Sequence, residues 1–393
     1  MQPTHTAPDT SAPPGGTGAA GTIVPAAVMA DGAPLATERA PARGRPRDSL
    51  PVLSVRNLKT HFKLDEGVVR AVDGVSFDLH AGEVVGIVGE SGCGKSITMK
   101  SILRLIQKPG RIVDGQIIYR RPPEAQHGAK KGKELATDLA RLPAQGRRMR
   151  QIRGGDIALI PQEPMASFSP LHSIGEQIVE AIRLHNPVSK EEARDIAIGK
   201  LREVGMPSPE QRFDSFSWQL SGGLRQRAII AMALSCNPSV LIADEPTTAI
   251  DVTTQAQVLE LLKQLQREHG SSILFITHDL GVIAQVADYV VVMYLGRVAE
   301  QGAVHDIFHN ARHPYTRALL QSVPSLHSEA RVALPTVAGS IPHPLHRPTG
   351  CPFHPRCPDF MPGKCDVHMP ALVAVDGGSP VACFLHHDQV EES

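Results

Sequence analysis

The strongest chemical pattern in the chain is the run from Gly89 to Ser96, GESGCGKS, which fits G-x-x-x-x-G-K-S. It follows an apolar run, Val84 to Val88, and precedes a helix that we predict to begin at Lys95. Glycines let the backbone curl so that successive N–H groups and the helix N-terminus face phosphate oxygens. Lys95 is expected to reach the outer phosphates of a nucleotide, and the Ser96 hydroxyl to ligate Mg²⁺. The residues predicted to contact nucleotide here are Gly89, Ser91, Gly92, Cys93, Gly94, Lys95, Ser96 and Ile97.

Cys93 lies inside this loop, where a helix N-terminus could lower the pKa of its thiol. It occupies a position that the pattern leaves unspecified. We therefore expect a non-catalytic residue whose alkylation would block nucleotide binding.

A second pattern, VLIADEP from Val240 to Pro246, brings two carboxylates to the end of a buried strand. Ligands bind at this end of the strands in parallel sheets. Asp244 is expected to hold Mg²⁺ through water, and Glu245 to polarise an attacking water. The alternative, a pair of solvated capping residues, is disfavoured by four preceding apolar positions and by the upstream phosphate loop.

The elements that must position these residues follow from the hydrophobic pattern. Short β-like runs separated by turn residues precede the phosphate loop, and helical periodicity dominates further along the chain. Strands alternating with helices predict a parallel, doubly wound α/β sheet. The predicted strands are 52–55, 71–79, 84–88, 240–243 and 272–276, and the predicted helical segments are 174–201 and 254–269.

A third motif, LSGGLRQR from Leu220 to Arg227, narrows the class of P-loop protein. It resembles the signature of ABC ATPases, L-S-G-G-Q in most members, with Leu224 in place of the usual Gln. Ser221, Gly222 and Gly223 keep the pattern and can open a helix toward a phosphate. The resemblance implies that this helix serves the ATP bound to a second ATPase subunit.

Further residues match the ABC pattern in order along the chain. Gln162 in IPQEP is similar to the Q-loop glutamine, which also implies a role near Mg²⁺, and His278 in ITHD to the switch histidine. Asp251 resembles the D-loop aspartate. Phe62 occupies the place of an aromatic that stacks on adenine, although a core phenylalanine is the alternative. Glu245, His278 and Gln162 are therefore the predicted catalytic residues.

Composition limits the other possibilities. The 393 residues include 40 Lys and Arg and 40 Asp and Glu, so no overall charge favours nucleic acid or an anionic membrane. No run of about 18 uncharged apolar residues is present, which predicts that the chain does not span a bilayer. Residues 1–50 have no aromatic residue and no basic segment ahead of their apolar patch; we expect a disordered tail without a secretory signal.

The segment from Tyr119 to Arg153 is unusually basic, with ten Lys and Arg against three acids. We interpret it as a solvated surface insertion. Contact with anionic lipid is the alternative.

Four cysteines, Cys351, Cys357, Cys365 and Cys383, cluster in a Pro-rich C-terminal segment. In a reducing cytosol, such clustering indicates metal more than disulfides. No C-x2-C knuckle is present, so zinc, an iron–sulfur cluster and disulfides all stay open on chemistry alone. The segment, together with HPYTRALL from His313, resembles the C-terminal extension of oligopeptide, dipeptide and nickel ABC importers, some of which bind a [4Fe-4S] cluster.

The resulting hypothesis is an α/β fold: a P-loop ABC ATPase with a RecA-like parallel-sheet core, an N-terminal antiparallel β subdomain, a helical subdomain and a small Cys-rich C-terminal extension. The expected units are a tail (1–50), an ABC ATPase domain (51–310, with a helical subdomain at about 163–235) and the extension (311–388).

The resemblance implies a peripheral subunit on the cytoplasmic face of the inner membrane. It would hydrolyse ATP with Mg²⁺ to drive peptide uptake, working with a second ABC ATPase subunit, two permease subunits and an extracytoplasmic solute-binding protein, without nucleic acid. The alternatives are import of nickel or another small solute, a soluble ABC ATPase not coupled to transport, and a redox regulator carrying a cluster.

Overall fold

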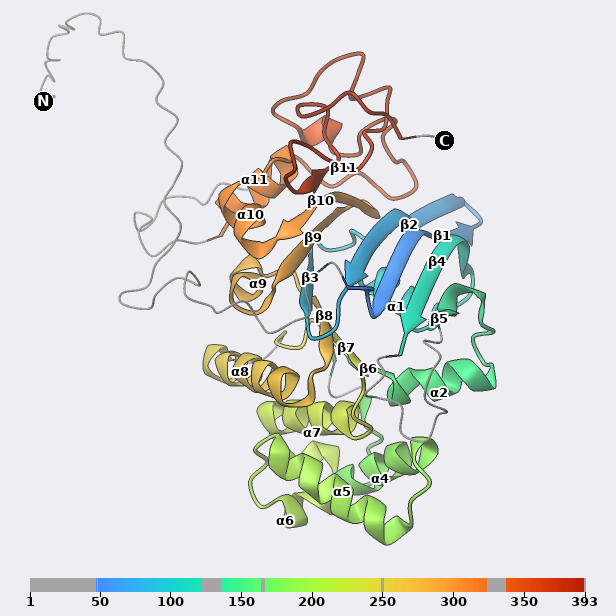
Figure 1. Ribbon diagram of the computed structural model, residues 1–393, viewed down its shortest axis with the longest axis vertical. Coiled ribbons are helices and arrows are strands. Elements are labelled where there is room, and N and C mark those ends of the chain that lie inside the picture. The colour runs from blue at the N-terminus through green and yellow to red at the C-terminus, as the bar shows by residue number, and fades with distance from the viewer. Residues whose placement is uncertain are drawn as a thin grey trace, which may run out of the picture.

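The computed structural model describes residues 47, 49–121, 136–163, 167–248, 251–323 and 337–391. Its N-terminal part is an antiparallel sheet with the strand order β2-β1-β4-β5 (Figure 1). The strands are β1 (Leu53–Leu64), β2 (Gly67–Leu79), β4 (Gly110–Arg120) and β5 (Ala136–Asp138). The register of β1 shifts against both neighbours, which bends the sheet at its centre.

The second sheet has the order β11-β12-β10-β9-β3-β8-β7-β6, and its strands from β9 to β6 run parallel. Every residue of β3, β7 and β8 is buried, because helices cover both faces of such a sheet. This burial explains why these strands are continuous apolar runs rather than alternating ones. The bounds are β3 (Val84–Val88), β6 (Ile157–Ile160), β7 (Val240–Asp244), β8 (Ser272–Ile276), β9 (Tyr289–Tyr294), β10 (Arg297–Ala303), β11 (Val373–Ala374) and β12 (Pro380–Val381).

Helices pack around this sheet and extend beyond its β6 edge. Those beyond the edge form a separate layer, which Figure 1 shows at the bottom of the molecule: α4 (Ile174–His185), α5 (Lys190–Glu203), α6 (Pro209–Phe213) and α7 (Gly222–Leu234). Capping boxes at Ser173 with Glu176, and at Ser189 with Glu192, fix where α4 and α5 begin. The others are α1 (Lys95–Ile102), α2 (Arg147–Gly155), α8 (Val252–His269), α9 (Leu280–Val286), α10 (Val304–His309) and α11 (Pro314–Gln321), with short 3-10 turns η3 (Leu139–Arg141), η4 (Ser217–Gln219) and η5 (His354–Arg356).

The C-terminal extension is joined directly to the main sheet. Its strand β12 pairs with β10, and β11 pairs with β12. Phe353 is buried in the same hydrophobic core as Tyr294 of β9 and Tyr315 of α11. The extension is thus packed on the main sheet rather than attached through a flexible joint (Figure 1).

Most predicted elements of the core are confirmed. The strands at 84–88 and 272–276 and the start of a helix at Lys95 lie as predicted, and the helix predicted from residue 254 begins at Val252. The first two strands are longer than expected: the outer half of β2 alternates exposed and half-buried residues, and β1 runs on to the exposed residues Lys63 and Leu64.

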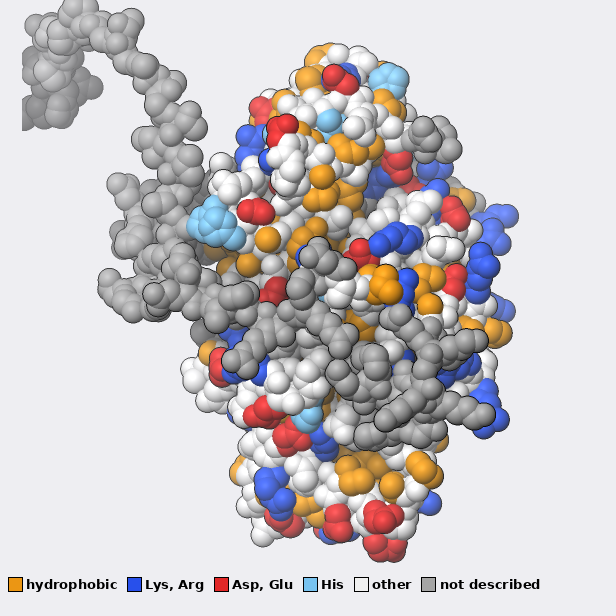
Figure 2. Space-filling view, viewed as in Figure 1, with side chains coloured by type: hydrophobic (Ala, Val, Ile, Leu, Met, Phe, Trp, Pro, Cys, Tyr) orange, Lys and Arg blue, Asp and Glu red, His pale blue; other side chains and the backbone are white. Residues whose placement is uncertain are grey.

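The interpretation of 119–153 as a solvated insertion holds only in part for the described parts of that segment, because Arg141, Arg147 and Arg150 are exposed while apolar residues between them pack inward. Tyr119, Met149 and Ile152 are buried in the core. Arg121 is ion-paired with Asp156, and the Arg153 guanidinium donates to the carbonyl of Leu103 at 2.8 Å. Figure 2 shows Lys and Arg side chains along the edge where the antiparallel sheet and α2 lie. Residues 122–135 lie outside the described residues.

Two further expectations concern membranes and the tail. Among the described residues, no helix has the length and apolar character needed to cross a bilayer. The tail predicted at 1–50 lies outside the described residues, apart from 47, 49 and 50.

Candidate active site

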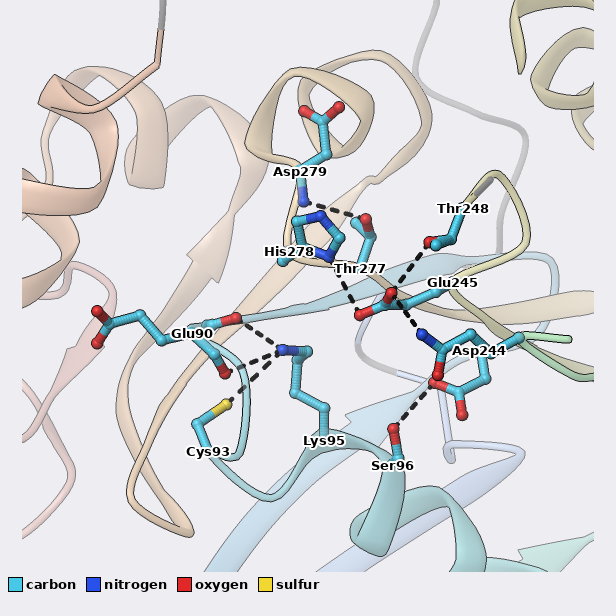
Figure 3. A network of polar contacts seen from close by, with 12 residues as sticks. Glu90, Cys93, Lys95, Ser96, Asp244, Glu245, Thr248, Thr277, His278 and Asp279 are labelled. Atoms are coloured by element: carbon cyan, nitrogen blue, oxygen red, sulfur yellow. Dashed lines mark hydrogen bonds and ion pairs between the residues drawn. The ribbon is translucent and has the colours of Figure 1, made fainter. Parts of the chain in front are cut away.

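The phosphate loop connects β3 to α1, as its sequence pattern predicts. Gly89 and Gly94 have φ angles of 148° and 103°, and a Cβ there would come within 2.2 Å of the Met293 carbonyl oxygen and 2.3 Å of the Ala71 carbonyl oxygen. Only glycine fits both the conformation and the space. The ammonium of Lys95 lies inside the loop and donates to the carbonyl oxygens of Gly89 at 2.7 Å and Glu90 at 3.1 Å (Figure 3). The loop therefore encloses one buried positive charge.

Asp244, at the end of β7, faces the start of α1. The Ser96 hydroxyl donates to Asp244 Oδ1 at 3.2 Å. Burial raises the pKa of Asp244, and the neighbouring Glu245 raises it further against the opposing bond from Ser96. A buried carboxylate beside a hydroxyl oxygen fits a divalent cation, because both are the oxygen ligands that Mg²⁺ prefers.

Glu245 is the centre of a polar network. Its side chain accepts hydrogen bonds from Gln162 Nε2 at 3.1 Å and Thr248 Oγ1 at 3.0 Å, and lies 3.1 Å from His278 Nδ1 (Figure 3). Although burial alone would raise it, the pKa of Glu245 is lowered, because His278 and Thr248 favour the carboxylate. Glu245 stays ionised and is held from three directions.

The backbone at Glu245 is in the left-handed region, with φ of 46°. This conformation is unfavourable for a residue with a Cβ, and such strain gathers at functional sites. The amide of Glu245 donates to the Ile276 carbonyl of β8 at 2.8 Å, which holds the turn in place. The same turn aims the side chain at His278 from the neighbouring strand.

Ser221 and Asp251 lie apart from this network, and each caps a helix. Ser221 accepts the Leu224 amide at 3.4 Å at the start of α7, and Asp251 accepts the Thr254 amide at 2.9 Å at the start of α8. A Cβ on Gly223 would lie 3.0 Å from Thr254 Cγ2, so the two helix starts are neighbours. Gly222 has nothing near its Cβ position, so the signature turn is open on that side.

Phe62 and Cys93 have surroundings that the sequence did not indicate. The Phe62 ring is half-buried and covers Gly110, where an added Cβ would lie 2.5 Å from it. Cys93 is only 3% exposed, and burial raises the pKa of its thiol despite the nearby Lys95. The pKa of the thiol is thus raised, rather than lowered as a helix terminus could have done, and ready alkylation of Cys93 is no longer expected.

The four C-terminal cysteines line one small cavity together with His313 and Phe353. Burial raises the pKa of Cys351 to about 12 and that of Cys383 to about 11, so these thiols are neutral without a cation. Among the described residues, however, no three Cys, His, Asp or Glu side chains form a group that could hold a metal ion. The arrangement thus does not support the predicted iron–sulfur cluster, although it brings all four sulfurs to one place.

Sequence reasoning missed four residues that contact the site. Thr248 holds Glu245, and a Thr two residues after an E-P pair gives no distinctive signal. Glu90, Tyr315 and Arg356 form a contact between the phosphate loop and the C-terminal extension. The HPYTRALL run carries Tyr315 and the Pro-rich cysteine segment carries Arg356, but neither pattern indicates a contact with Glu90.

Fold and site together place the chain among the ATP-binding cassette ATPases, because a phosphate loop, a paired-carboxylate strand end and a separate helical layer share one α/β sheet. Sequence families agree: residues 72–248 match the ABC transporter family, and residues 299–365 match the oligopeptide/dipeptide transporter C-terminal region.

Curated relatives and solved structures extend this match. The chain is 45% identical to a dipeptide transport ATP-binding protein of Bacillus subtilis, covering 87% of this chain and 97% of the relative. It is 46% identical to an oligopeptide transport ATP-binding protein of the same organism, covering 87% and 98%. A dimeric ATP-binding cassette bound to ADP and Pi is similar at a TM-score of 0.54 and 26% identity, covering 64% of this chain and 98% of the cassette. The chain belongs to the ABC transporter ATP-binding proteins of the oligopeptide/dipeptide type, and it is an ATPase of the ABC class.

Proposed function

We propose that this ATPase energises peptide uptake across the cytoplasmic membrane, acting from the cytoplasmic face through two permease subunits and a solute-binding protein. The printed names of its relatives support dipeptides or oligopeptides as the cargo. The observation that carries the ATPase mechanism is the network in which Gln162, Thr248 and His278 hold Glu245 beside the Asp244–Ser96 pair. In this proposal residues 51–310 form the motor, with the helical part at about 163–235, and residues 311–388 form its extension.

The phosphate loop binds the triphosphate through its backbone N–H groups and the ammonium of Lys95. Lys95 is 5% exposed and already held at the loop centre by two carbonyl oxygens, so little reorganisation is needed. Gly89, Ser91, Gly92, Cys93, Gly94 and Ile97 shape the rest of the pocket. Phe62, half-buried on β1, supplies the aromatic face for adenine.

Glu245 orients and polarises the attacking water. Its carboxylate is ionised, since the pKa is lowered by His278 and Thr248, and it can accept a proton from water as the new bond forms. Gln162 places an amide next to the same oxygen atom that Thr248 holds. His278, whose side chain is 61% exposed, can turn toward the γ-phosphate.

Ser96, Asp244 and Gln162 are the residues that would hold Mg²⁺. The ion would supply neutralisation of the charge that develops on the phosphoryl oxygens. Asp244 provides a buried carboxylate for it, and Ser96 a hydroxyl 3.2 Å from that carboxylate.

Two cassettes close head to tail, so that Ser221, Gly222 and Gly223 of one face the nucleotide of the other. The open turn at Gly222 and the capped start of α7 leave a helix N-terminus available for a phosphate. Asp251, at the adjoining start of α8, lies where it can report the state of one site to the other. Dimeric cassettes among the similar structures support this arrangement.

The helical layer docks the permease. Three large apolar side chains in or next to this layer are well exposed to solvent: Leu171 at 82%, Leu184 at 73% and Trp218 at 62%. Large exposed apolar side chains can mark a surface that binds another protein. Gln162 precedes α4 in the chain, so a permease that docks on this layer can change the hydrogen bond from Gln162 to Glu245.

The four-cysteine cavity would hold a metal centre if its thiolates moved closer together, and a [4Fe-4S] cluster is the form that the resemblance of this segment to the C-terminal extension of peptide importers implies. Cys351, Cys357, Cys365 and Cys383 would ligate it, and it would supply cross-links that a small Pro-rich segment otherwise lacks. The four sulfurs line one cavity, but within the described residues they form no group close enough to hold a metal ion, so closer approach of the thiolates on loading is required.

Affinity purification from native membranes, followed by reconstitution into vesicles, tests the proposal. We expect two permeases and a binding protein to co-purify, and ATP-dependent uptake of a labelled peptide mixture that stops in the Lys95→Ala variant. Uptake of nickel instead of peptides would show that nickel, not peptides, is the cargo. Recovery of ribosomes or DNA-repair factors alone would overturn the transport role.

A further inference from the structure

We propose that Arg356 and Tyr315 of the C-terminal extension are positioning residues for the phosphate loop, so that ATP affinity depends on a contact made by the extension. The inference rests on the proposed nucleotide role of the loop. It assigns the extension a part in ATP binding.

The contact is made on Glu90, the second residue of the loop. The Arg356 guanidinium donates to both carboxylate oxygens of Glu90, from Nη1 at 2.7 Å and from Nη2 at 3.0 Å. The backbone amide of Glu90 donates to the Tyr315 hydroxyl at 2.9 Å. In Figure 3 the Glu90 side chain points away from Lys95, Ser96 and the carboxylates of the site. The extension therefore holds both the side chain and the backbone of one loop residue.

This ion pair is buried at its Arg356 end. The Arg356 side chain is 3% exposed and that of Glu90 is 22% exposed. A two-pronged Arg–carboxylate contact fixes direction as well as distance, and removal of one partner leaves the other as an uncompensated charge. Arg356 also donates to the carbonyl oxygens of Ala338 and Val337, which fixes the guanidinium from behind.

The position of the carboxylate gives the contact a consequence for nucleotide binding. Glu90 carries a negative charge within the loop that must accept a triphosphate, and its own carbonyl oxygen accepts from Lys95 at 3.1 Å. Paired with Arg356, the carboxylate is neutralised and turned outward. Without Arg356 it would repel the phosphates and compete with them for Lys95.

The same contact connects the loop to the cysteine cavity. Arg356 ends the 3-10 turn η5, which lies between Cys351 and Cys357. The His354 amide donates to the Cys351 carbonyl at 3.0 Å, and the Cys357 amide to the His354 carbonyl at 3.2 Å. Whatever orders these thiols also orders the turn that aims Arg356 at the loop.

ATP hydrolysis by the purified transporter complex tests the proposal. We expect Arg356→Ala to raise the KM for ATP roughly 5- to 50-fold, with kcat changed much less. Tyr315→Phe should raise KM in the same direction by a smaller factor, because only one acceptor is lost. The matched control is Arg317→Ala, which breaks the half-exposed pair between Arg317 and Asp359 in the same part of the chain.

A rescue experiment separates positioning from simple structural support. In Arg356→Ala the uncompensated charge of Glu90 should make the KM for ATP depend more strongly on salt. Adding Glu90→Gln removes this charge, so the double variant should regain much of the ATP affinity and lose the added salt dependence. Arg356→Lys keeps the charge and loses the fork, and serves if Arg356→Ala does not fold. We expect an intermediate KM for it.

The opposing results are distinct. An unchanged KM in Arg356→Ala together with a lower Tm would show that the ion pair only stabilises the fold, and would overturn the inference. An equal rise in KM in Arg317→Ala, or no rescue by Glu90→Gln, would overturn it as well. Unchanged ATP binding in Lys95→Ala would instead contradict the proposed nucleotide role of the loop, on which the inference rests.

Discussion

Gln162 and Glu245 are 83 residues apart in the sequence, yet the Gln162 amide donates to the Glu245 carboxylate at 3.1 Å. Gln162 follows β6, and Glu245 follows the adjacent parallel strand β7. The chain beyond Gln162 leads into the helical layer. This single hydrogen bond therefore joins the proposed hydrolytic carboxylate to the surface on which a permease would act.

Glu245→Gln should stop turnover while ATP binding persists. The amide keeps the size of the side chain and its contact with Thr248 but cannot accept a proton from water, so kcat should fall by roughly 10²- to 10⁴-fold. ATPase assays and binding of a fluorescent nucleotide measure the two effects. Glu268→Gln, on the exposed end of α8, is the control. Near-normal kcat in Glu245→Gln would remove Glu245 from the mechanism.

Asp244→Asn should stabilise the nucleotide-free chain at pH 7 while abolishing Mg²⁺-dependent hydrolysis. Burial raises the pKa of Asp244, so its ionised form opposes folding above that pKa, and the amide removes this cost. We expect a gain of roughly 0.5–2 kcal/mol at pH 7 that shrinks as the pH falls and the aspartate becomes protonated. Thermal unfolding at several pH values without Mg²⁺ measures it. A loss of stability at pH 7 would contradict the electrostatic account.

The chain should lose stability in mild acid through His313. Burial, with Arg317 and His386 adding to it, lowers the pKa of His313 to about 3, and its Nδ1 accepts the Tyr315 amide at 3.0 Å. Its contribution is therefore complete above an unfolded-state pKa of about 6.5 and is lost as the pH falls toward 3, at about 1.4 kcal/mol per pH unit. Denaturant titrations between pH 7 and 5 measure the slope.

His313→Asn supplies the control for this acid effect. Asparagine also caps helix starts, so it can keep the bond to the Tyr315 amide without a titrating ring. The variant should be less stable at pH 7 because the packed ring is lost, but it should have a flatter pH dependence. An unchanged slope would show that other groups cause the acid sensitivity.

Mixed dimers test the head-to-tail arrangement. Lys95→Ala and Ser221→Ala each inactivate both sites of a homodimer, whereas a mixed dimer keeps one site with an intact loop and an intact signature. Two different affinity tags select the mixed species, which should recover up to about half of the normal ATPase activity. Inactive mixed dimers would contradict the shared site, and absence of doubly tagged dimers would contradict self-pairing.

If the four thiolates close on a cluster as proposed, the cysteines should hold iron when the chain is purified anaerobically. We expect about four iron and four sulfide per chain, with visible absorption that is lost in Cys357→Ser. Cys236→Ser, a thiol outside the cavity, should keep both. Stoichiometric zinc without iron would show that the cavity is a zinc site. Absence of any metal would show that the four cysteines pack in the extension as thiols.

The local chemistry of the site could be predicted from the sequence because its motifs are contiguous. GESGCGKS directly follows the apolar strand Val84–Val88, and VLIADEP contains an apolar strand and the residues after it, so strand, turn and ligand groups are fixed by neighbours in the chain. The parallel core could be predicted for the same reason. The basic run at 119–153 was predicted only in part, because burial of Met149 and Ile152 depends on a core formed by distant strands.

The sequence by itself determined the class of nucleotide site, the parallel strands that carry it and the capped helix starts at Ser221 and Asp251, because each depends on interactions within a few residues. The tertiary structure alone decided the burial that raises the pKa of Cys93, the three-sided hold on Glu245 and the pairing of Glu90 with Arg356. Those properties arise where segments up to 266 residues apart exclude water from a shared space, and no local pattern encodes that exclusion.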